Sequence, residues 1–213
     1  MTKVFIFTGP TLRPEEARAE LDAVYLPPVQ QGDVYRAARE GPVAIGIIDG
    51  FFEHVPAVWH KEILWAMSEG IHVFGASSMG ALRATELAAF GMEGVGDIFD
   101  AFHRGELEDD DDVAVAHAGA EDGWRPLSEA MVNVSATLSA AWLERVVSEG
   151  TRMALEQKAK ALFYVDRTWP RVLAEGARAG LPASELEALK AWLPSGRVDV
   201  KRADALALLR TMR

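Results

Sequence analysis

The sequence predicts an α/β fold, with a mainly parallel sheet flanked by helices and a C-terminal helical annex. Three observations lead to this prediction. Short apolar runs alternate with helical patterns in the first half, the central runs are apolar on both faces, and the chain after Leu127 is nearly all helical in pattern. Parallel strands are buried on both faces and are joined by crossover helices. We therefore expect an α/β core over residues 1–120 and a mostly helical region over residues 121–213, packed on the core or extending it.

The individual elements follow from their residue types and boundaries. Apolar and β-branched runs predict strands at residues 4–7, 24–26, 43–48 and 71–74, and the segment 113–117 is a candidate for one more. Helices are predicted from Pro14, from Asp33 to residue 40, through Trp59 to residue 67, and from Ser78 to residue 90. A loop-rich stretch is expected after Gly91, and helix breaks are expected near Pro170, Pro182 and Pro194.

Composition narrows the classes of function. The chain has 213 residues, no cysteine and a formal net charge of −10. The lack of cysteine excludes disulfides, thiolate metal sites and cysteine nucleophiles. The acidic balance argues against generic nucleic-acid binding, although the tail segment 197–202 is locally basic and is a candidate to bind a partner. The five histidines lack zinc-ligand spacing and the acidic run 106–112 lacks that of a calcium loop, so we expect neither a metal nor another cofactor.

The sequence also bears on location. No apolar run is long enough to cross a bilayer. The first residues have the pattern of a strand rather than that of a signal peptide. We therefore expect a cytoplasmic protein that binds neither membranes nor nucleic acid.

The strongest candidate for chemistry is Ser78, in the turn Gly75-Ala-Ser-Ser-Met-Gly80 between a buried strand and a helix. Small residues flank Ser78 at the spacing of a nucleophile elbow, which exposes a hydroxyl at the carboxyl edge of a sheet. The N–H groups of Met79 and Gly80 are candidate donors to an oxyanion or carboxylate, with Ser77 beside them. Two other interpretations stay open: Ser77 or Ser78 caps the helix, or the turn binds phosphate, although the Walker lysine is missing.

Lys61 is the candidate general base. Because Trp59 and Ile63 form the apolar face of its helix, the simplest interpretation is a solvated lysine. Loops after adjacent parallel strands meet at one edge of the sheet, however, so Lys61 is also a candidate to reach the Ser78 turn. A lysine desolvated there becomes neutral and acts as a base.

Several other polar residues are expected to have roles near the Ser78 turn or on its helix. Asp49 ends a buried strand, and Gly9 and Thr11 follow the first strand, so we expect these three residues to line the same cleft. Arg83 lies about 140° around the helix from Ser78. We therefore expect Arg83 to pair with Glu86 or to contact a partner, and His60 to have a structural or partner-binding role.

Taken together, these stretches resemble the TfuA family, the proteins that accompany YcaO enzymes in peptide backbone thioamidation. The resemblance runs in order over residues 3–120. Its most specific segments are Trp59-His-Lys-Glu-Ile-Leu64 and Ser78-Met-Gly-Ala-Leu-Arg-Ala84. It also includes Phe7–Leu12, Pro27-Pro28 with Gly32-Asp33, Ile47–Phe51, Gly91–Gly96 and Asp110–Ala114.

The resemblance implies a hydrolase-like Ser-Lys site at Ser78 and Lys61. It further implies hydrolysis of a thiocarboxylated, ThiS-like sulfur carrier, with release of sulfide for a YcaO partner that the protein also helps to engage its peptide substrate. Because the partner activates the peptide with ATP, this chain is expected to need no nucleotide. Two alternatives remain: a non-catalytic adaptor that docks the YcaO enzyme and its substrate, and an α/β module that binds a small molecule or phosphate.

Overall fold

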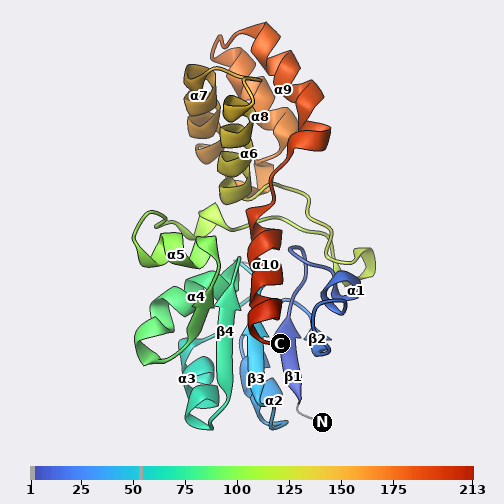
Figure 1. The fold of residues 1–213 in the computed structure, drawn as a ribbon, viewed down its shortest axis with the longest axis vertical. Coiled ribbons are helices and arrows are strands. Elements are labelled where there is room, and N and C mark those ends of the chain that lie inside the picture. The colour runs from blue at the N-terminus through green and yellow to red at the C-terminus, as the bar shows by residue number, and fades with distance from the viewer. Residues whose placement is uncertain (1–2, 53–54) are drawn as a thin grey trace. The chain divides into compact units, whose positions relative to one another are not determined.

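The structure, a computed structural model, describes residues 3–52 and 55–213 and divides the chain into two units (Figure 1). The sheet unit contains the residues up to Asp110, together with 118–125 and 201–213. The helical unit contains residues 111–117 and 126–200. This division differs from a single boundary near residue 120, because the end of the chain belongs to the sheet unit.

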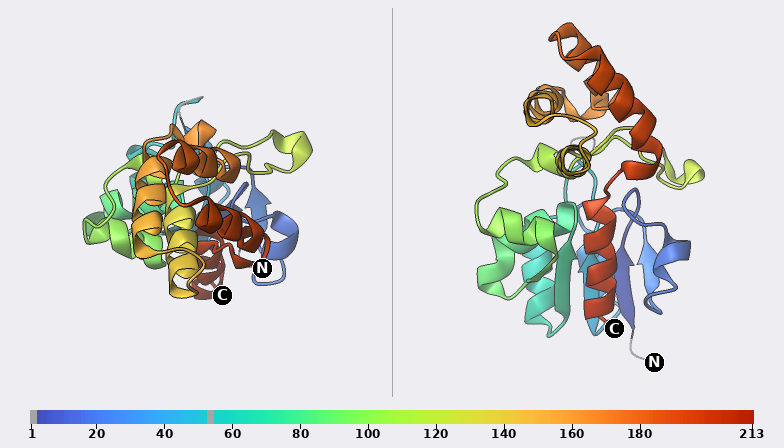
Figure 2. Two further views of the ribbon diagram at one scale, coloured as in Figure 1. Left: turned by 90° about the horizontal axis from the view of Figure 1, so that it is seen from above. Right: turned by 45° about the horizontal axis from the view of Figure 1, so that its top comes forward.

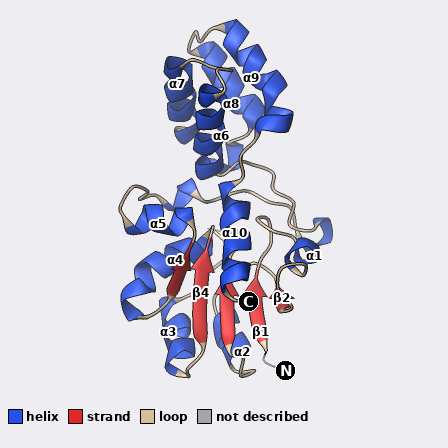
Figure 3. Ribbon diagram, in the orientation of Figure 1, coloured by secondary structure: helices blue, strands red, loops and turns tan. Residues whose placement is uncertain are grey.

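The sheet has five parallel strands, which confirms the predicted α/β class (Figure 3). The strand order is β2-β1-β3-β4-β5. The strands are β1 (Val4–Phe7), β2 (Val24–Leu26), β3 (Ala44–Ile47), β4 (His72–Ala76) and β5 (Glu93–Val95). The order reverses direction between β1 and β3, which is the place where parallel α/β sheets form their binding crevices.

Two expectations about strands are wrong. The short strand β5 lies in the stretch that was expected to be a loop, because its sequence Glu-Gly-Val has no apolar run and it pairs only with β4, at the edge of the sheet. The segment 113–117 forms no strand. It contains only an isolated bridge between His117 and Pro126, so its alternating pattern has no neighbouring strand to pair with.

Helices cover both faces of the sheet. The helices of this unit are α1 (Pro14–Ala17), α2 (Asp33–Ala38), α3 (His60–Ser68), α4 (Met79–Leu87), α5 (Asp97–His103) and α10 (Val200–Thr211). Helices α2, α3 and α4 pack on the face that carries Phe5, Ile45 and Val73. Helices α1 and α10 pack on the opposite face, against Ile6 and Phe74.

Helix α10 is the feature that sequence patterns assigned to the helical annex and that the structure places on the sheet (Figure 2). Its residues Ala205, Leu208 and Leu209 are fully buried in the cluster that contains Ile6 and Phe74. Two exposed ion pairs also connect it with the segment that begins at α1: Arg202 with Glu16, and Arg210 with Glu20, each at 2.8 Å. The C-terminal helix is therefore part of the core that carries the Ser78 turn.

The helical unit has its own hydrophobic core. Its helices are α6 (Met131–Leu143), α7 (Glu149–Lys160), α8 (Trp169–Arg178) and α9 (Ala183–Gly196). The predicted breaks at two prolines are confirmed, because Pro170 lies in the first turn of α8 and Pro182 is the N-cap of α9. Pro194 is different, since it lies inside the last turns of α9. Among the described residues, no helix combines the length and hydrophobicity that a membrane span requires.

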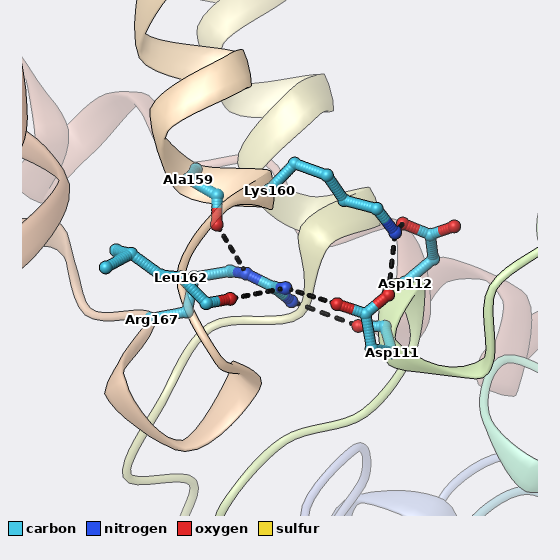
Figure 4. A network of polar contacts seen from close by, with 6 residues as sticks. All are labelled: Asp111, Asp112, Ala159, Lys160, Leu162 and Arg167. Carbon is cyan, nitrogen blue, oxygen red and sulfur yellow. Dashed lines mark hydrogen bonds and ion pairs between the residues drawn. The ribbon is translucent and has the colours of Figure 1, made fainter.

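A buried arginine organises the polar interior of the helical unit (Figure 4). Arg167 is 0 % exposed and donates hydrogen bonds to the carbonyl oxygens of Ala159, Asp111 and Leu162 and to the Asp111 carboxylate, at 2.7–3.2 Å. Lys160 adds ion pairs to Asp111 and Asp112, both at 2.6 Å. Burial opposes ionisation of Asp111, but the hydrogen bonds from Lys160 and Arg167 hold its pKa below the usual value. These carboxylates neutralise cationic side chains within the unit.

We expect Arg167→Met to destabilise the helical unit by about 3 to 5 kcal/mol, because the substitution leaves several buried oxygens without a donor. Urea denaturation followed by circular dichroism at 222 nm measures this loss. The matched control is Arg171→Met, since Arg171 is half exposed and, within residues 3–52 and 55–213, forms an ion pair only with Glu175. The control is expected to change the free energy of unfolding by no more than about 0.5 kcal/mol. Equal effects of the two substitutions would contradict the structural role of Arg167.

Candidate active site

The Ser78 turn is sharply bent between β4 and α4. Ser77 has a φ of +68°, in the left-handed region, and the N–H of Ser78 donates to the carbonyl of Ala76 at 2.8 Å. A turn of this tightness is strained for a residue with a side chain. The Ser77 hydroxyl is fully buried, and no hydrogen-bond partner for it exists among the described residues. The strained position of this elbow is thus Ser77, and Ser78 follows it with a φ of −119°.

Ser78 occupies the N-cap position of α4, yet its side chain makes no capping hydrogen bond. The capping interpretation of this serine requires such a bond, because a capping oxygen accepts from the backbone N–H two or three residues later. The hydroxyl has a different partner. Lys201 Nζ donates to Ser78 Oγ at 3.1 Å, and both residues are 3 % exposed.

Lys201 reaches Ser78 because it lies in the first turn of α10, and this helix begins near the carboxyl ends of the strands (Figure 1). The two residues are separated by 123 positions in the sequence. The structure therefore brings Ser78 together with Lys201. The expectation that Lys61 is the neighbouring lysine has no support in the contacts, since Lys61 is an exposed residue of the first turn of α3.

Two glycines allow α4 to begin directly against the sheet. A Cβ atom on Gly80 would lie 1.8 Å from the Ile47 carbonyl oxygen, and one on Gly75 would lie 2.1 Å from the Gly80 oxygen. The Gly80 N–H donates to the Ile48 carbonyl at 3.2 Å. This corrects the expectation that Gly80 offers a free oxyanion donor. The N–H of Met79 donates to no other residue in the described part of the chain, so it is the remaining candidate.

Asp49, Gly9 and Thr11 come together as expected, at the point where the strand order reverses. The Asp49 carboxylate accepts the N–H groups of Gly9 and Thr11 at 2.8 and 3.0 Å and the Thr11 hydroxyl at 2.6 Å. Asp49 is only 1 % exposed. The contacts therefore show that Asp49 holds the loop after β1 in position, which leaves its oxygens engaged within the protein.

Glu62, the residue next to Lys61, has a structural role in the Trp59-His-Lys-Glu62 segment. Glu62 is buried, and its carboxylate accepts the N–H groups of Trp59 at 2.8 Å, Gly32 at 3.0 Å and Tyr35 at 3.2 Å. These three N–H groups belong to the starts of α3 and α2, where backbone donors lack partners within the helix. One carboxylate thus joins the beginnings of two helices, which is a structural role for the Trp-His-Lys-Glu segment.

Arg83 and His60 form a partly exposed polar group with Glu86. Arg83 contacts Glu86 at 2.7 Å, as its spacing predicts, and its Nε donates to the Val58 carbonyl at 3.0 Å. His60 Nε2 lies 2.7 Å from the same Glu86 carboxylate. These contacts connect α4 with the start of α3, and none of them reaches Ser78.

One turn after Lys201, a second buried charged residue lies on α10. Asp204 is 4 % exposed and accepts the N–H groups of Asp97 and Ile98 at the start of α5, at 3.0 and 2.9 Å. Burial raises the pKa of Asp204 to about 6, against the opposing effect of the two backbone hydrogen bonds, and the nearby charges of Asp97 and Asp100 raise it further.

Sequence reasoning missed Lys201 and Asp204 as site residues. A signal for them exists, because Lys201, Asp204, Ala205 and Leu208 recur at the spacing of one helical face. Charged residues on the face that is otherwise apolar are uncommon, since Lys and Asp are rarely buried without a partner. The basic segment 197–202 draws attention to its exposed arginines instead.

Comparison with known protein families identifies the family of this chain. A model of the family described as TfuA-like protein matches residues 49–168, more than half of the chain. The matched region contains Asp49, Lys61 and Ser78 and ends before Lys201. No curated protein matches the sequence. TfuA-like proteins are associated with YcaO enzymes, which points to an accessory role beside such an enzyme. The chain belongs to the TfuA-like protein family.

Proposed function

We propose that this chain is an accessory hydrolase of YcaO-dependent thioamidation. Its substrate is a thiocarboxylated sulfur carrier of the ThiS type, from which it releases sulfide, and it also helps the YcaO partner to engage its peptide substrate. The observation that carries the proposal is the 3.1 Å hydrogen bond between Lys201 Nζ and Ser78 Oγ, made by two buried side chains. A serine next to a lysine that serves as its base is a recurrent nucleophile arrangement.

In the first step, the neutral amine of Lys201 takes the proton of the Ser78 hydroxyl, and Oγ attacks the carbon of the thiocarboxylate. The resulting oxyanion accepts a hydrogen bond from the Met79 N–H at the start of α4, where the helix dipole also favours negative charge. The carbon–sulfur bond then breaks. The proton on Lys201 passes to the leaving sulfur, which departs as hydrosulfide, and the carrier is left as an ester of Ser78.

In the second step, Lys201 takes a proton from water, and the hydroxide attacks the ester carbon. The bond to Ser78 Oγ breaks and Lys201 returns the proton to this oxygen. The carboxylic acid formed on the carrier loses its proton to solvent, and the carrier leaves as its carboxylate. Both steps require the neutral form of the amine. Exclusion from water favours the neutral form of a lysine in general, and Lys201 is almost completely excluded from solvent.

The test is sulfide release from a thiocarboxylated ThiS-type carrier by the wild type and by Ser78→Ala. Because Ser78 forms the covalent intermediate, we expect the variant to lose activity by at least about 10³-fold. Ser68→Ala is the matched control, since Ser68 is exposed at the end of α3 and its hydroxyl donates to the carbonyl of Trp65 in the preceding turn. Circular dichroism confirms that each variant is folded.

The outcomes separate this proposal from the non-catalytic alternative. Loss of sulfide release in Ser78→Ala alone supports the hydrolase. If the wild type releases no sulfide, or if Ser78→Ala equals the wild type, the hydrolase proposal fails. The protein is then better described as an adaptor that docks a YcaO enzyme and its substrate.

A further inference from the structure

Asp204 lies in the same helix as Lys201 but makes its contacts with a different element of the sheet unit. We infer that Asp204 is a positioning residue: by holding the start of α5, its carboxylate fixes α10 so that Lys201 Nζ meets Ser78 Oγ. The catalytic consequence of this inference rests on the proposed function. The geometric part concerns the distance between two atoms and is independent of it.

The contact between Asp204 and α5 is directional. Oδ1 accepts the N–H of Asp97 at 3.0 Å, and Oδ2 accepts the N–H of Ile98 at 2.9 Å. Gly96, with a φ of +99°, precedes them, and a Cβ atom there would lie 2.3 Å from Asp204 Cγ. The carboxylate is therefore seated directly against the backbone. Since both oxygens are engaged by neighbouring N–H groups, the rotation and the axial position of α10 are both defined.

The apolar contacts of α10 and its two arginine ion pairs define its position less sharply. Ala205, Leu208 and Leu209 bury apolar surface, and burial of this kind is not directional. The ion pairs of Arg202 with Glu16 and of Arg210 with Glu20 join long, solvent-exposed side chains. Exposed pairs of this kind contribute little. Among these contacts, the carboxylate of Asp204 is the one that combines burial with two well-aligned hydrogen bonds.

Few structural elements separate Asp204 from the two reacting atoms, Lys201 Nζ and Ser78 Oγ. Lys201 precedes Asp204 by three residues, which places the two side chains on one face of α10. Helix α5 packs against α4, and α4 begins immediately after Ser78. Asp204 thus connects the helix that carries the lysine with α5, and through α5 with α4, the helix that follows the serine. A displacement of about 1 Å at such a site is enough to lower a rate about 10²-fold.

The experiment compares crystal structures of Asp204→Asn and Asp204→Ala with that of the wild type. The asparagine variant keeps one acceptor oxygen and places an amide NH₂ against the second backbone donor, so it perturbs the contact with little change in volume. We expect the separation of Lys201 Nζ and Ser78 Oγ to exceed about 3.5 Å in both variants, beyond hydrogen-bond distance. Glu16→Gln weakens the exposed ion pair between Arg202 of α10 and Glu16 of α1. This control is expected to leave the hydrogen bond between Lys201 and Ser78 intact.

Kinetics of sulfide release provide the second measurement. We expect Asp204→Asn to lower kcat by about 10- to 100-fold with KM nearly unchanged, because a misplaced base slows the chemical step without altering carrier binding. A hydrogen bond that persists in both variants overturns the inference, whether or not the wild type is a hydrolase. A broken bond with an unchanged kcat overturns the catalytic part and argues against Lys201 as the base. A wild type without activity but with the expected displacement leaves the positioning role established and rejects only the proposed function.

Discussion

Lys201→Met is expected to lower sulfide release by at least about 10³-fold, whereas Lys61→Met is expected to leave it within about twofold of the wild type. The first substitution removes the amine that donates to the Ser78 hydroxyl at 3.1 Å, and methionine retains much of the buried volume. The second acts on an exposed side chain in the first turn of α3. Assignment of the base to Lys201 and assignment to Lys61 therefore predict opposite results for these two variants.

The measurement is the initial rate of sulfide release from a thiocarboxylated carrier at saturating concentration, with folding checked by circular dichroism. Lys201→Arg refines the comparison, because a guanidinium keeps the positive charge and the hydrogen-bond donors but is not deprotonated in proteins. An inactive arginine variant supports proton transfer by Lys201. An active arginine variant contradicts general-base catalysis by this residue, and inactivation by Lys61→Met alone returns the role to Lys61.

Gly80→Ala is expected to destabilise the sheet unit by about 3 kcal/mol or more. The added methyl group would lie 1.8 Å from the Ile47 carbonyl oxygen and 2.6 Å from its carbon, both of which are backbone atoms of the central strand β3 or its end. Neither atom moves without displacing the strand, so relief requires a shift of α4. Such a shift also weakens the hydrogen bond from the Gly80 N–H to the Ile48 carbonyl.

Urea denaturation and hydrogen exchange of the β3 and β4 amides measure this effect. Gly150→Ala is the matched control, because Gly150 lies in the first turn of α7 and a Cβ atom there meets nothing within 4 Å. The same chemical change is expected to stabilise the helical unit by about 0.5 to 1 kcal/mol, through the higher helix propensity of alanine. Loss of stability in both variants would show that the close approach of α4 to the sheet is not the cause.

The sequence alone determined the α/β class, four of the five strands and the Ser78 turn. These features depend on local patterns, because a parallel strand buried on both faces is a continuous apolar run, and a helix start is set by a few neighbouring residues. The edge strand β5 escaped detection, since its three residues include a charge and a glycine and its pairing with β4 stabilises it. The spacing of Arg83 and Glu86 likewise predicted their ion pair correctly.

Tertiary structure alone decided which charged residue meets Ser78 Oγ. The family resemblance includes both the segment with Ser78 and the segment with Lys61. Yet Lys61 is exposed, and its neighbour Glu62 joins two helix starts. Lys201 comes from the far end of the chain, because α10 leaves the helical unit and packs on the sheet with Ala205 and Leu208. No local pattern encodes a contact across 123 positions. It arises from burial of an apolar helix face, which carries a lysine and an aspartate with it into the core.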